Sequence, residues 1–82
     1  MSRDLYADGF ELAEQVRAVG HASWALRIEE SIEYGSTSSE ILFGLWKTTD
    51  ELLHDVPGLP EATRELAIGL TAAIRQVLKG SG

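Results

Sequence analysis

The segment from Thr37 to His54 is the feature that most constrains the fold of this chain. Thr37 and Glu40 have the spacing of a capping box, in which the threonine hydroxyl accepts from the backbone N–H of Glu40 and the glutamate carboxylate accepts from the N–H of Thr37. Apolar residues follow at helical spacing, namely Ile41, Leu42, Leu45, Trp46, Leu52 and Leu53. We therefore expect a helix over residues 38–54 and expect the other helices to pack on it.

Three further segments carry the same periodicity of about 3.6 residues. They predict helices over residues 4–19, 22–34 and 60–79, followed by a frayed tail at 80–82. No stretch alternates apolar and polar residues around a hairpin turn, so the sequence carries no strand signal. Since short links make consecutive helices antiparallel neighbours, we expect an all-α fold, a small four-helix bundle that forms a single domain over residues 1–82.

Local signals mark where these helices begin and end. Ser2 or Asp4 is suited to cap the first helix, and Gly20 is suited to end it in a left-handed conformation. Gly35 is a second stop signal, after the second helix. Pro60 suits the first position of the last helix, because proline lacks the N–H that is unpaired there in any case.

Composition excludes several classes of function. The net charge of −6 argues against a nucleic-acid binder, which needs a basic surface. The absence of cysteine excludes disulfides and thiolate zinc sites and fits a reducing cytoplasm, so we expect a cytoplasmic location.

No apolar run approaches the ~18 residues of a membrane span, so we expect no membrane partner. A chain of 82 residues has a thin core, which a protein partner or a second copy would help to stabilise.

The negative charge is concentrated in the middle of the chain. Residues 29–61 carry a net charge of −7, and the remainder carries +1. An acidic helical surface of this kind complements a basic protein, although the same charges also fit a solvated surface. The predicted partner-binding residues are Glu29, Glu30, Glu33, Tyr34, Phe43, Asp50, Glu51 and Asp55.

Three apolar residues fall outside the apolar arcs of their helices. On a helical wheel, Leu26, Phe43 and Ile68 lie opposite or far from the residues that should form the core. Exposed apolar residues that form a patch mark an interface, so the three are candidates for a homodimer or partner interface. The alternative is a central helix that packs on two sides and buries Phe43.

The sequence offers no complete catalytic or metal-binding pattern. Glu51 and His54 have the Glu-x-x-His spacing that forms half of a di-metal site, but the chain has no second copy of it. The serine-rich segment at residues 36–39 lacks an activating base at a defined position. We therefore expect neither an enzyme nor a resident metal or cofactor.

The segment Gly35, Ser36, Thr37, Ser38 and Ser39 resembles the motif that opens the second helix of acyl carrier proteins. The resemblance implies a carrier protein with phosphopantetheine attached to Ser38. The motif departs from that family at Thr37, where the family has aspartate, and at Ser39, where it has leucine. This carrier function is one alternative to an interaction protein.

Two residue clusters resemble short bacterial helical proteins, some of which accompany toxin systems. The clusters are Gly20, His21, Trp24 and Ala25, followed by Gly35, Ser36, Thr37, Glu40, Ile41 and Leu42. In size, acidity and helicity the chain is also similar to colicin-type immunity proteins. Together with the acidic helical surface, these resemblances lead us to expect a non-enzymatic interaction protein, most concretely an immunity- or antitoxin-like inhibitor that binds a basic toxin domain. The alternative is a homodimeric helical module with Leu26, Phe43 and Ile68 in its interface.

Overall fold

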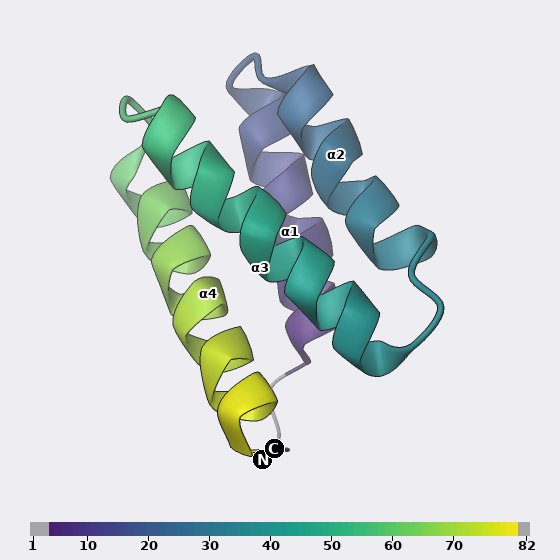
Figure 1. Cartoon of the computed structure of the whole chain (residues 1–82). Coiled ribbons are helices and arrows are strands. Elements are labelled where there is room, and N and C mark those ends of the chain that lie inside the picture. Colours follow the sequence, from purple (N-terminus) through teal and green to yellow (C-terminus); the bar gives the residue numbers. More distant parts are fainter. Residues whose placement is uncertain (1–3, 81–82) are drawn as a thin grey trace.

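Four helices form an all-α bundle in the computed structural model, which describes residues 4–80. They are α1 (Leu5–Ala18), α2 (Ala22–Glu33), α3 (Ser38–Asp55) and α4 (Glu61–Gly80), and residues 4–80 contain no strand. Each helix packs against the next, and α1 packs against α4, so that the four helices close into a ring (Figure 1). The predicted fold class is therefore confirmed. None of these helices combines the length and apolar character that crossing a membrane requires within residues 4–80.

The helix ends lie close to their predicted positions. Helix α4 begins at Glu61, one residue after Pro60, whose carbonyl accepts from the N–H of Arg64 at 2.9 Å. Gly80 was expected in the tail but is the last residue of α4, while the rest of that predicted tail lies outside the described residues.

The core lies where the four apolar stripes meet in the centre of the ring. Its buried side chains come from every helix and from the link before α4: Leu12, Ala13, Val16, Ala25, Ile28, Ile32, Leu42, Leu45, Leu52, Leu59, Ala67, Leu70 and Ile74. Three residues predicted for the core of α3, Ile41, Trp46 and Leu53, are only half-buried at its edge. Trp46 is therefore available to line a surface feature.

Helix α3 is one of four corners and not the central helix that we expected. It packs on α2 and α4, whereas α1 packs on α2 and α4 from the other side. Helix α1 packs closely against the core at Gly9. A Cβ atom added to this glycine would lie 2.8 Å from Cδ1 of Ile32 and 3.1 Å from Cδ2 of Leu45. The absence of a side chain at Gly9 therefore allows the helices to close around the core.

The start of α3 confirms one half of the predicted capping box and corrects the other. The N–H of Glu40 donates to the hydroxyl oxygen of Thr37 at 3.2 Å, as predicted. The Glu40 carboxylate accepts from the N–H of Ser36 at 3.2 Å, and not from that of Thr37. The carboxylate thus reaches one residue further back and ties the link between α2 and α3 to the first turn of α3.

Helix α1 has the predicted signals at both ends. The Asp4 carboxylate accepts from the N–H of Ala7 at 3.1 Å, so Asp4 is the N-cap, and the alternative cap Ser2 lies outside the described residues. Gly20 has a φ of 92°, and its N–H donates to the carbonyl of Arg17 at 3.1 Å. This left-handed residue closes the helix and reverses the chain into α2.

Gly35 follows the end of α2 as predicted, but for a different physical reason from Gly20. Gly20 is the only glycine with a positive φ in residues 4–80. At Gly35, an added Cβ would overlap Cγ1 of Ile41 and lie 3.1 Å from the Ile41 Cα. Gly35 is therefore required because the first turn of α3 packs directly against the link.

We expect Gly35→Ala to lower the free energy of unfolding by about 1–3 kcal/mol, because the backbone of Ile41 must move to admit a methyl group. Gly58→Ala is the matched control, since nothing lies within 4 Å of an added Cβ at Gly58. Its effect should stay within about 0.5 kcal/mol. Urea denaturation followed by circular dichroism measures both, and equal effects would contradict the packing argument.

Two buried threonines differ in whether the hydroxyl group has a hydrogen-bond partner within residues 4–80. The hydroxyl of Thr63 donates to Oε1 of Gln15 at 2.7 Å and so joins α4 to α1. The hydroxyl of Thr49 on α3 is fully buried and has no hydrogen-bond partner within residues 4–80. A buried polar group without a partner has lost its hydration without compensation.

Thr49→Val should therefore raise the free energy of unfolding by about 1 kcal/mol, because it removes the unpaired hydroxyl and keeps the shape of the side chain. Thr63→Val should lower it by about 1 kcal/mol, because Gln15 loses its donor. Thermal denaturation of the two variants tests the contrast. A loss of stability in Thr49→Val would show that the hydroxyl is satisfied.

Candidate functional site

Two of the predicted acidic residues are held in ion pairs within the bundle. Glu29 on α2 accepts from Arg17 on α1 at 2.7 Å, and Glu51 on α3 accepts from Arg27 on α2 at 2.7 Å. The hydrogen bond to Glu29 raises the pKa of Arg17 above its usual value. The guanidinium of Arg27 also lies over the ring of Trp24, at 4.3 Å from the ring centroid. Glu29 and Glu51 therefore link neighbouring helices and have little charge left for a partner.

Asp50 is associated with His54 at the end of α3. Nδ1 of His54 lies 2.9 Å from the Asp50 carbonyl and 3.8 Å from the Asp50 carboxylate. The backbone hydrogen bond, followed by the charges of Asp50 and Asp55, raises the pKa of the His54 imidazole above 6.5. Protonated His54 therefore offsets part of the negative charge at this end of the bundle.

Glu30, Glu33 and Tyr34 form an exposed group that we call the acidic end of α2. All three side chains are exposed, and Tyr34 reaches 80% exposure. Neither carboxylate has an ion pair or side-chain hydrogen bond with any residue of the described chain. Because residues four apart are neighbours on a helix, Glu30 lies beside Tyr34. The acidic end of α2 thus combines an aromatic group with two uncompensated charges.

Asp55 lies at the opposite end of the bundle from this group. It is the last residue of α3, and α3 begins just after the acidic end of α2 (Figure 1). At 1.5 Å per residue, α3 separates its two ends by about 25 Å. The structure therefore does not bring the predicted acidic residues onto one continuous surface.

The three apolar residues predicted for an interface are exposed but lie on three different helices. Exposed fractions are 53% for Leu26 on α2, 55% for Phe43 on α3 and 47% for Ile68 on α4. Helices α2 and α4 occupy opposite corners of the ring, so Leu26 and Ile68 point away from the core in different directions. Phe43 is not buried by a second helix, which excludes the alternative of a central α3.

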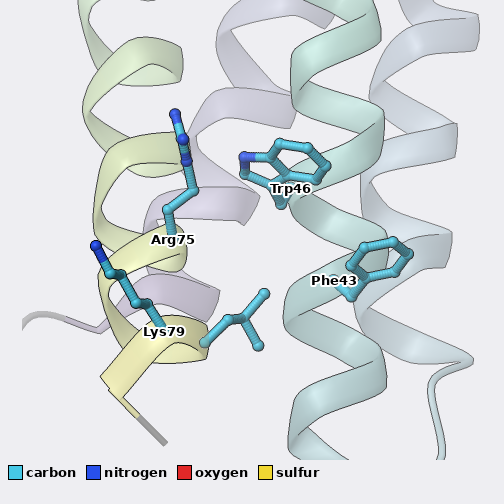
Figure 2. Close-up of a pocket in the computed structure, with 5 residues that line it drawn as sticks. Phe43, Trp46, Arg75 and Lys79 are labelled. Carbon is cyan, nitrogen blue, oxygen red and sulfur yellow. The ribbon is translucent and has the colours of Figure 1, made fainter. Parts of the chain in front are cut away.

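Phe43 belongs instead to a surface groove between α3 and α4, which we call the α3/α4 groove. The groove has a volume of about 340 Å³ and is lined by Phe43, Trp46, Arg75, Leu78 and Lys79. Figure 2 shows the indole nitrogen of Trp46 turned toward Arg75 on α4, whereas the ring of Phe43 lies on the side of α3 that is further from α4.

Sequence reasoning missed the basic residues of this groove. Arg75 and Lys79 are four residues apart, and Phe43 and Trp46 are three apart, so each pair shares one side of its helix. Those spacings are visible in the sequence. Their meeting depends on α3 and α4 packing side by side in one particular rotation, which the spacings do not specify.

The residues considered for chemistry lie on α3, and the structure shows the surroundings of each. Ser38 is the exposed first residue of α3. Glu51 binds Arg27 while His54 contacts Asp50, so the two residues of the Glu-x-x-His pattern have separate partners. Residues 4–80 hold no cluster of three or more side chains suited to a metal ion.

Comparison with known proteins gives no relative for this chain. No protein-family model matches it, and no curated protein or solved structure does so either. The functional assignment therefore depends on the surface described above.

The raised pKa of His54 predicts a dependence of stability on pH. Since the pKa is higher in the folded state than in the unfolded state, the stabilisation is complete below pH 6.5 and is lost as the pH rises through the folded value. His54→Gln should therefore lower stability at pH 5.5 and leave it nearly unchanged at pH 8.5. An NMR titration should give a pKa above 6.5 for His54, and Asp50→Asn should reduce it. A pKa at or below 6.5 would contradict the contact.

Proposed function

We propose that this chain is a non-enzymatic protein-interaction module that binds a basic partner protein through the acidic end of α2. The observation that carries the proposal is Tyr34, which is 80% exposed beside the uncompensated carboxylates of Glu30 and Glu33. Tyrosine is among the residues that most often dominate binding energy at protein interfaces. An aromatic group surrounded by one sign of charge selects for a partner with a pocket and a basic rim.

The two kinds of residue have separate roles in this proposal. The carboxylates of Glu30 and Glu33 attract the basic partner before contact and raise the association rate. The ring of Tyr34 enters a pocket on the partner and slows dissociation, because burying an aromatic side chain removes a large apolar area from water.

The distance of each acidic residue from the acidic end of α2, and the screening of its charge by salt, determine whether it contributes to contact with a partner. The Debye length is about 8 Å at physiological ionic strength. Asp55, at the far end of α3, is separated from the acidic end of α2 by about 25 Å along the helix axis. Asp50 and Asp55 therefore add to the overall field during approach but not to the contact itself.

The most specific form of the proposal is an immunity- or antitoxin-like inhibitor in the bacterial cytoplasm. Toxins that cut nucleic acid need a basic cleft to hold the phosphate backbone. A small acidic domain that occupies such a cleft competes with the nucleic acid for the same basic side chains. The net charge of −6 and the exposed acidic end of α2 support this class of partner.

The test is a binding experiment with a partner captured from the native host by the tagged chain. Glu30→Lys combined with Glu33→Lys should lower the association rate at least about tenfold at low salt, because attraction becomes repulsion. Tyr34→Ala should raise the dissociation rate about 30-fold, as the loss of a dominant interface residue does. Stopped-flow fluorescence or surface plasmon resonance measures both rates.

Glu61→Lys combined with Glu65→Lys is the matched control, since both residues are exposed on α4 and the change in charge is identical. This control should affect the association rate much less. If both double variants slow association equally, only the net charge matters and the proposed site is wrong.

A further inference from the structure

The α3/α4 groove has a chemistry opposite to that of the acidic end of α2. Arg75 and Lys79 are exposed, and neither forms an ion pair or a side-chain hydrogen bond with the described residues. In contrast, Arg17 and Arg27 are both paired with glutamates within the bundle. Within residues 4–80, two cations therefore line one groove of an acidic chain without an ionic partner.

The apolar residues that line the groove are Phe43, Trp46 and Leu78. The rings of Phe43 and Trp46 are stacked with centroids 6.0 Å apart and an interplanar angle of 29°. Phe43 is 55% exposed, and Leu78 is half-buried beside the basic residues. A volume of about 340 Å³ lies at the lower end of the range of about 300–1,000 Å³ for small-ligand sites. The groove can therefore admit one large apolar side chain.

The distance between the two basic side chains indicates how far apart the negative charges of a bound ligand should lie. Arg75 and Lys79 lie four residues apart on α4, so their side chains project from the same side of the helix, about 6 Å apart along its axis. Carboxylates that are three or four residues apart on a second helix have the same separation. A helix that lies along the groove can therefore pair two carboxylates with the two cations while its apolar side chain enters between them.

We propose that the α3/α4 groove binds an acidic amphipathic helix of a partner protein. One large apolar side chain packs against Phe43, Trp46 and Leu78, and flanking carboxylates pair with Arg75 and Lys79. Arg75 and Lys79 supply the attraction, because neither has an ionic partner within residues 4–80. This inference stands apart from the proposed function, since it concerns another surface and a partner of opposite charge.

The probe is a capped alanine-rich helical peptide of about 15 residues, long enough to form a helix in water. It carries one phenylalanine, with glutamates three and four residues away on both sides. Binding should shift the NMR resonance of the Trp46 indole N–H and leave that of Trp24 in place, with Trp24→Phe used to assign the two signals. A control peptide with lysines in place of the glutamates should bind at least about tenfold more weakly.

Variants of the chain test each half of the site. Arg75→Ala combined with Lys79→Ala should weaken binding at least about tenfold, and Phe43→Ala should weaken it about 30-fold. Arg64→Ala, which removes an exposed cation from α4 outside the groove, is the matched control and should leave the affinity unchanged. All of these residues are exposed, and circular dichroism verifies the fold of each variant.

Three outcomes would overturn the proposal. The first is that the Trp46 resonance does not move at about millimolar peptide, a concentration that captures even weak association. The second is equal binding of the lysine peptide, which would leave no role for the two cations. The third is a dimer of the free chain in light scattering that Phe43→Ala disrupts, because the groove would then be occupied by a second copy.

Discussion

The burial of four apolar stripes in one small core is the interaction on which the rest of the structure depends. Leu12, Ile28, Leu45 and Leu70 represent the four helices in this core, and each is fully buried. Burying one such side chain contributes about 1.5–3 kcal/mol, whereas the net stability of a domain is only about 5–15 kcal/mol. Removing any one helix would expose the stripes of its two neighbours, so each helix depends on the others to bury its apolar residues.

The order of the helices around that core determines which charges remain available. Because α2 lies between α1 and α3, its two sides meet Arg17 on one helix and Glu51 on the other. Glu29 and Arg27 face those partners and form ion pairs with them. Glu30 and Glu33 face neither neighbour, and so they have no ionic partner within residues 4–80 and remain charged beside Tyr34. The charged surface is thus set by how the core orients each helix, and composition alone does not determine it.

This dependence explains which features were predictable from the sequence. The helices and their ends were predictable, since caps such as Asp4 and stop residues such as Gly20 act through local geometry. The second bond of the capping box was misplaced, because the Glu40 carboxylate selects its donor according to the path of the link. The α3/α4 groove and the Arg17–Glu29 pair were not predictable, because they depend on how each helix is rotated about its axis against the next helix.

Net charge alone does not determine where the charges without an ionic partner lie within residues 4–80. Two of the exposed aromatic side chains, Tyr34 and Phe43, lie beside charged residues that have no ionic partner within residues 4–80, and the charges differ in sign. A single exposed aromatic residue needs no functional explanation. A solvated surface gives no reason for carboxylates to gather at one ring and cations at the other. The two proposed partners of opposite charge would give one, because each ring would supply binding energy and its neighbouring charges would determine which partner binds.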